Sequence, residues 1–144
     1  IAKASLIGPA PLAARFAADV RITHPNFGLL IDLSHIPMTY ETPAFVVRSL
    51  RPYLTHFHIG NTVCQNPAAE GYGDEHQRFG FPGGSNDTAE VLNFLRVLRD
   101  EGFMDAENPY VLSFEVKPWK DEDPDMVVAG AKRVLNRAWA LLEE

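Results

Sequence analysis

Three short apolar segments alternate with helical patterns along this chain, and this alternation limits the folds open to it. The apolar segments span residues 28–32, 55–60 and roughly 110–116, and they have the length of buried strands. Strands that alternate with helices are typical of a parallel sheet joined by right-handed helical crossovers. The sequence therefore predicts an α/β fold with parallel strands.

Helices are expected before, between and after the strands. Thr42 followed by Pro43, and Asp123 followed by Pro124, are typical of helix starts. Apolar residues recur at helical spacing in four segments, which are 9–23, 42–54, 87–102 and 123–142. Three parallel strands neither close a barrel nor form a protected open sheet. The order αβαβαβα therefore predicts about three β/α units of a (β/α)8 TIM barrel, with outer helices.

Length and charge limit the organisation and the partners. The chain has 144 residues, of which 46% are apolar, so we expect a single partial-barrel domain over residues 1–144. The net charge is −6 and no cluster of Lys and Arg is longer than a pair, so we expect no nucleic-acid partner. The first residue is Ile1 rather than methionine, and we expect further N-terminal sequence in the complete protein.

Cysteine content and hydropathy indicate the cellular compartment. Cys64 is the only cysteine, which excludes an internal disulfide and fits a reducing environment. No apolar run approaches the ~18 residues that a membrane span needs, and the N-terminus lacks the basic-then-apolar pattern of a signal peptide. We therefore expect a cytoplasmic protein without a membrane partner.

Each predicted strand ends on a residue type that binds metal ions. The first strand runs into IDLSH with Asp32 and His35, the second into HFHIGN with His58, and the third into SFEVKP with Glu115. Parallel strands place their carboxyl ends at one edge of a sheet or barrel. We therefore expect Asp32, His58 and Glu115 to meet at one divalent metal ion. Their oxygen and nitrogen atoms suit Mn²⁺, Mg²⁺, Co²⁺ or Zn²⁺.

Other interpretations of these residues stay open at this point. Asp32 could cap a helix or form a turn, and His35 could be an ordinary loop histidine. Glu115 could form a buried ion pair with Lys117 or with an arginine, since a buried carboxylate needs compensation. The combination of these residues at one end of three strands, more than any one of them, therefore favours a metal site.

His56 lies on the same face of its strand as His58, because side chains alternate along a strand and Phe57 separates the two. His56 is one layer further from the carboxyl end. We expect it to support the metal-binding residues through a hydrogen bond, and not to bind the ion itself.

The segments IDLSH, HFHIGN and SFEVKP resemble the last three strands of the xylose-isomerase-like barrel superfamily, which contains sugar phosphate isomerases and epimerases and AP-endonuclease-type enzymes. The resemblance covers nearly the whole chain and implies strands six, seven and eight of such a barrel. It implies one divalent metal held by Asp32, His58 and Glu115, and a catalytic, substrate-binding role for His35. The family's strand-five glutamate has no counterpart, because no glutamate precedes Asp32.

The polar segment 61–86 is far longer than an ordinary connection, so we expect it to be functional or disordered. Its Asp74-x-His76 spacing is similar to the pair that holds an additional zinc in the AP-endonuclease branch, which implies a second metal site. In the epimerase branch the equivalent loop supplies an arginine to the substrate, and Arg78 could play that part. The alternative is a solvated turn bounded by glycines.

The resemblance implies a metal-dependent isomerase or epimerase of a small sugar or hydroxy-carbonyl compound, in which Glu115 moves a proton through an enediolate. One alternative is an AP-endonuclease-like zinc phosphodiesterase that uses Asp74 and His76. Another is a non-catalytic barrel fragment or partner-binding subunit. Strand edges left by the absent barrel strands predict a homo-oligomer, or pairing with an N-terminal half.

Overall fold

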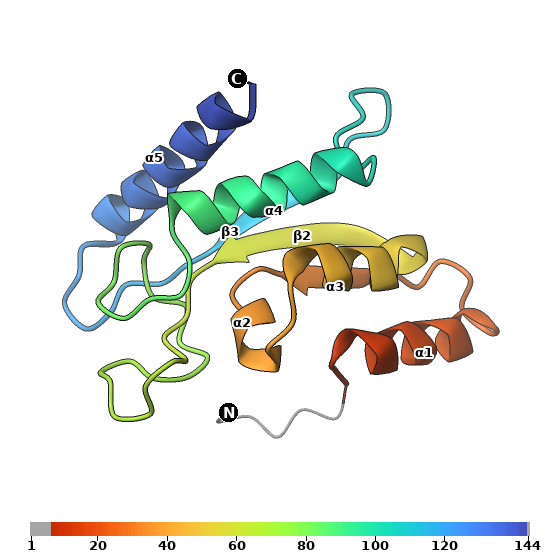
Figure 1. Ribbon diagram of the computed structural model, residues 1–144, viewed down its shortest axis with the longest axis horizontal. Coiled ribbons are helices and arrows are strands. Elements are labelled where there is room, and N and C mark those ends of the chain that lie inside the picture. The colour runs from red at the N-terminus through yellow and green to blue at the C-terminus, as the bar shows by residue number, and fades with distance from the viewer. Residues whose placement is uncertain (1–6, 144) are drawn as a thin grey trace.

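A computed structural model describes residues 7–143, and a parallel three-stranded sheet forms its centre (Figure 1). The strands β1 (Leu29–Asp32), β2 (Leu54–Gly60) and β3 (Val111–Glu115) lie side by side in that order. The helices are α1 (Ala10–Arg21), α2 (Ile36–Thr39), α3 (Pro43–Leu50), α4 (Thr88–Asp100) and α5 (Pro124–Glu143), with a 3-10 turn η1 (Arg51–Tyr53). The α/β prediction is confirmed, whereas α2 and η1 were not predicted. Ile1 lies outside the described residues.

Side-chain caps mark the starts of two of the expected helices. Thr42 Oγ1 accepts a hydrogen bond from the Phe45 N–H at 3.3 Å. Asp87 and Glu90 form a capping box at the start of α4, in which each side chain accepts a backbone N–H.

Among residues 7–143, no helix has the length and apolar character required to cross a membrane.

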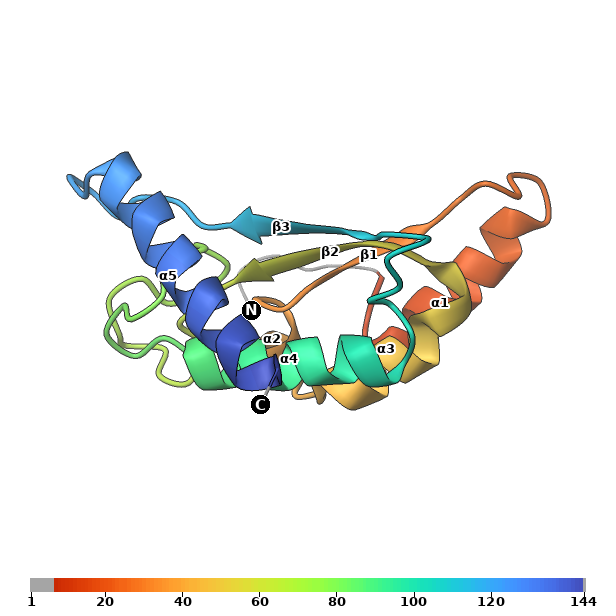
Figure 2. The same ribbon diagram turned by 90° about the horizontal axis from the view of Figure 1, so that it is seen from above.

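The core lies between the sheet and helices α3 and α4, which cover one face of it (Figure 2). Phe57 of β2 is fully buried there, and its ring packs edge-to-face on Phe94 of α4 and on Phe103, with centroids 6.1 and 5.1 Å apart. Helix α1 packs beside α3, and α5 packs beside α4. Phe57 therefore faces the helices, as the alternation of side chains around His56 and His58 predicts.

The opposite face of the sheet has no helical cover in the described part of the chain (Figure 2). Leu30 of β1 is 45% exposed and Val111 of β3 is 54% exposed on it. The first strand is apolar on both faces in the sequence, which is typical of a strand covered on both sides. The difference has a topological reason: two crossovers of the same hand that step in the same direction place their helices on the same face.

Buried asparagines hold the carboxyl ends of β1 and β2 together. Asn86 Nδ2 donates to the carbonyl oxygens of Leu33 and Gly60, at 3.1 and 3.0 Å. Asn61 Oδ1 in turn accepts from the Asn86 N–H at 2.9 Å. These bonds fix the points where the segment 61–86 leaves the sheet and rejoins it, directly beside the predicted ligands.

Removing the Asn86 amide should destabilise the fold. We expect Asn86→Ala to lower the free energy of unfolding by about 2 kcal/mol or more, because two buried carbonyl oxygens lose their donor. Asn108 is an exposed asparagine whose amide donates to Asp105, so Asn108→Ala should change the free energy of unfolding by less than ~0.5 kcal/mol. Urea denaturation measures the free energy of unfolding of both variants. Equal losses would contradict the role of Asn86 in holding the ends of β1 and β2 together.

Candidate metal centre

The carboxyl ends of the three strands bring the predicted ligands together. In the sheet, Asp32 lies beside His58, and Gly60 lies beside Glu115. Asp32, His58 and Glu115 each offer a ligand atom within 4.8 Å of the other two. His58 Nδ1 is also in hydrogen-bond contact with Glu115 Oε2. The three side chains are therefore positioned to hold a metal ion.

Asp32 is almost completely buried and is held by the residue two positions later. The Ser34 N–H donates to Asp32 Oδ1 at 2.8 Å, and Ser34 Oγ donates to Oδ2 at 2.6 Å. Burial raises the pKa of Asp32 above its ordinary value, and it outweighs the opposing effect of these hydrogen bonds. Within residues 7–143 no Lys or Arg forms an ion pair with Asp32. The ionised carboxylate therefore needs a histidine or a bound cation.

Glu115 is less buried than Asp32 and its pKa moves in the opposite direction. Burial by itself raises the pKa of Glu115, but the hydrogen bond with His58, followed by the contacts with Asp32 and His76, holds it below its ordinary value. Lys117 donates to Glu75 Oε2 at 2.7 Å. The alternative of a Glu115–Lys117 ion pair is therefore wrong, because Lys117 lies beyond the strand and is turned toward the loop.

The segment 61–86 carries Asp74 and His76 to the strand ends. His76 has φ of 51°, in the left-handed region that histidine adopts more readily than most residues. Its Nε2 lies 2.8 Å from Asp74 Oδ1 and 3.5 Å from Glu115 Oε1. The Asp-x-His pair thus belongs to the same cluster as the strand ends, and it is not a solvated turn.

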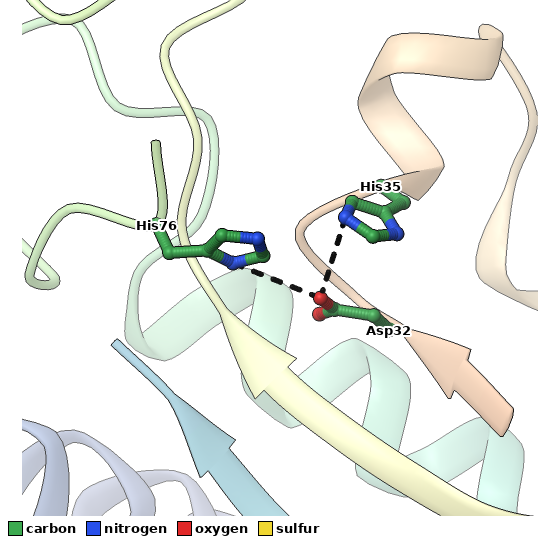
Figure 3. Close-up of side chains that lie close together, drawn as sticks. All are labelled: Asp32, His35 and His76. Atoms are coloured by element: carbon green, nitrogen blue, oxygen red, sulfur yellow. Dashed lines mark ion pairs between the residues drawn. The ribbon is translucent and has the colours of Figure 1, made fainter. Parts of the chain in front are cut away.

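Asp32 also faces a second group of ligand atoms, formed with His35 and His76 (Figure 3). His35 Nε2 lies 3.7 Å from Asp32 Oδ2, and His76 Nδ1 lies 3.8 Å from the same oxygen. His35 Nε2 is closer still to Asp74 Oδ1, at 2.9 Å. Asp32 is therefore shared by two groups, one on the strands and one that includes the loop.

The donor set fits a divalent metal ion. It contains three carboxylates and three imidazoles, which offer the oxygen and nitrogen ligands that such ions take in proteins. The six side chains are Asp32, His35, His58, Asp74, His76 and Glu115. A cation among them would compensate the buried carboxylate of Asp32, to which residues 7–143 offer only hydrogen bonds and histidines.

His56 and Arg78 do not join the cluster. His56 is one layer deeper, as predicted, with its ring 4.9 Å from that of His58 and its Nε2 3.3 Å from Ser113 Oγ. Arg78 donates to Glu122 at 2.7 Å and lines a cavity of about 400 Å³ beside the start of α5. The substrate-binding role of Arg78 stays a prediction.

Sequence reasoning overlooked Ser34 and Gly60. Ser34 follows Asp32 by two residues, the spacing at which an aspartate accepts from a following N–H in a turn, so the Asp-x-Ser pattern could have revealed it. A Cβ on Gly60 would lie 2.4 Å from the Glu115 carbonyl oxygen. Gly60 therefore allows β2 and β3 to approach closely where their ligands meet.

Comparison with known proteins gives this chain no family. The sequence matches no protein-family model and no curated protein. The candidate centre therefore rests on the convergence of side chains from three strand ends and one loop, together with the burial of Asp32.

Replacing Asp32 by asparagine should separate stability from metal binding. Because burial raises the pKa of Asp32, the stability of the metal-free fold falls as the pH rises through that value. Asp32→Asn removes this loss, so the metal-free variant should be at least as stable as the wild type at neutral pH. The Zn²⁺ affinity of the variant should fall by more than ~10–100-fold, the loss seen when a residue that only hydrogen-bonds to a metal ligand is removed.

Urea unfolding across pH and calorimetric titration with Zn²⁺ measure the two effects of Asp32→Asn. Normal Zn²⁺ binding by the variant would rule Asp32 out as a ligand. A metal-free variant that is less stable than the wild type at every pH would contradict the unfavourable burial of the charge.

Replacing a ligand histidine should remove a bound ion. We expect His58→Ala to lose about one equivalent of divalent metal, measured by elemental analysis after dialysis. His24 is an exposed histidine that contacts Thr23, so His24→Ala is the matched control and should keep the wild-type metal content. Equal metal content in both variants would show that the ion lies elsewhere.

Proposed function

We propose that this chain is part of a metal-dependent isomerase or epimerase that acts on a small sugar or hydroxy-carbonyl compound. The observation that carries the proposal is the convergence of Asp32, His58 and Glu115 at the carboxyl ends of adjacent parallel strands. The resemblance of the same residues to the metal ligands of the xylose-isomerase-like superfamily supports it.

We further propose that the sheet is the last three strands of a (β/α)8 barrel. Its strands follow one another in sequence order, and α3 and α4 cover the same face. In such barrels the helices form an outer ring and the opposite face lines the interior. Leu30 and Val111 would then be covered by further strands, from an N-terminal half or from a second copy.

The chemistry follows from where each side chain lies. A divalent ion held by Asp32, His58 and Glu115 would act as a Lewis acid on a substrate carbonyl. Glu115, at the partly exposed side of the cluster, would take up and return the proton on the carbon next to that carbonyl. His35, whose side chain is 47% exposed, would orient a substrate hydroxyl. The imidazoles favour Zn²⁺, Co²⁺ or Mn²⁺ over Mg²⁺.

A second candidate is a phosphodiesterase with two or more zinc ions. The observation that favours it is the position of Asp74 and His76, which join His35 and Asp32 to form a further ligand group. Two ions of this kind can hold the attacking and leaving oxygens of a phosphoryl transfer. The net charge of −6 opposes a nucleic-acid substrate.

Deuterium exchange tests the proposed isomerase. One base is enough to remove a proton and return a deuteron to the same face of the carbon, so this chain should exchange without needing the strand-five glutamate. We expect the chain loaded with Mn²⁺ or Co²⁺ to incorporate deuterium next to the carbonyl of small ketoses in D₂O. Glu115→Gln should slow this by ~10²–10⁴-fold. Proton NMR of the sugar measures the exchange.

The alternatives give different results in the same preparations. Asp74→Asn should leave the exchange unchanged if one metal ion on the strands is sufficient. If no ketose exchanges but the chain cleaves a phosphodiester such as bis(p-nitrophenyl) phosphate, and Asp74→Asn abolishes this cleavage, the hydrolase replaces the isomerase. If the metal-loaded protein shows neither activity, a partner-binding role is favoured.

A further inference from the structure

Ser34 contacts residues of both ligand groups at once. Its side chain is fully buried, and its Oγ lies 2.6 Å from Asp32 Oδ2 and 3.2 Å from His76 Nδ1. Asp32 comes from β1, whereas His76 comes from the distant segment 61–86. One hydroxyl therefore links the strand that carries the buried carboxylate to the loop that carries the histidine.

The direction of the two hydrogen bonds follows from what each group can donate. A serine hydroxyl has one proton, and an ionised carboxylate can only accept. The 2.6 Å contact is typical of a hydroxyl that donates to a carboxylate, so the Ser34 proton points to Asp32. The oxygen of Ser34 then has only lone pairs for His76 Nδ1, which must carry the hydrogen.

In the neutral ring, the other nitrogen of His76 is left with a lone pair. A neutral imidazole carries one N–H, so a hydrogen on Nδ1 leaves Nε2 as an acceptor. Nε2 faces two carboxylate oxygens, Asp74 Oδ1 at 2.8 Å and Glu115 Oε1 at 3.5 Å. A lone pair among carboxylate oxygens is repelled unless a cation lies between them.

From this geometry we infer that Ser34 is a positioning residue, which fixes His76 as its Nδ1–H tautomer so that Nε2 is the atom that binds metal. The inference rests on the proposed metal centre. The nitrogen that faces Asp32 in Figure 3 is Nδ1, which carries the hydrogen and so cannot bind an ion. The inference therefore assigns His76 to an ion that it shares with Asp74 and Glu115. The same hydroxyl orients Asp32, so one side chain sets the geometry of both groups.

Nitrogen NMR of protein labelled with ¹⁵N-histidine tests the tautomer directly. In metal-free protein, at a pH where the ring is neutral, we expect the hydrogen of His76 on Nδ1, and added Zn²⁺ should perturb Nε2. In Ser34→Ala the ring should populate both tautomers, and the Zn²⁺ affinity should fall by ~10–100-fold. Ser113→Ala removes the hydroxyl that contacts His56, and it should leave the His76 signals unchanged.

A second pair of variants keeps the test decisive if Ser34→Ala does not fold. His76→Gln places an amide near the position of Nε2, and His76→Asn places it near Nδ1, so the glutamine variant should retain more Zn²⁺ affinity. The inference would be overturned by zinc bound through Nδ1 or by an unchanged His76 tautomer in folded Ser34→Ala. It would also be overturned if His76→Asn bound Zn²⁺ more tightly than His76→Gln. If Zn²⁺ binds at Nε2 but no ketose exchanges, only the proposed isomerase fails.

Discussion

The buried carboxylate of Asp32 is the constraint on which the site depends. A charge removed from water must be offset nearby, and the described chain offers it two hydrogen bonds from Ser34 and two histidines, but no lysine or arginine. The fold thus accepts an unfavourable charge at the end of its first strand. Such an arrangement is understandable where a cation is to be bound, because a preformed anionic site without a competing ammonium group leaves the carboxylate oxygens available.

The rest of the structure holds other ligands at fixed positions around that carboxylate. The parallel register brings His58 beside Asp32, and Gly60 lets Glu115 approach. The loop is tied to the segment after β3, because the Lys117 N–H donates to the His76 carbonyl oxygen and Lys117 Nζ pairs with Glu75. The ligands on β3 and on the loop are therefore positioned by one another, and a change in either should be felt by both.

The sequence was sufficient for the three strands, the four longer helices and the candidate ligands at the strand ends, because all of them follow from local patterns. Periodicity and caps located the helices, and polar residues at the ends of apolar strands located Asp32, His58 and Glu115. Contacts between distant segments could not be predicted in this way. The spacing within the loop suggested Asp74 and His76 as a pair, but it could not show that His35 meets Asp74, or that Arg78 pairs with Glu122, 44 positions away. The uncovered sheet face was also missed, since an apolar strand has the same sequence whether its cover is present or absent.

The charge of the cluster relates the number of metal ions to the kind of substrate. The cluster contains three carboxylates, Asp32, Asp74 and Glu115, and histidines that bind a metal ion do so in their neutral form. Arg78, on the same loop, is paired with Glu122. One divalent ion would leave the site with a net negative charge, which suits an uncharged sugar and repels a phosphate group. A second ion would make the site positive and reverse that preference. Under either proposed function the same six side chains would be used, and metal occupancy, more than any single residue, would decide between them.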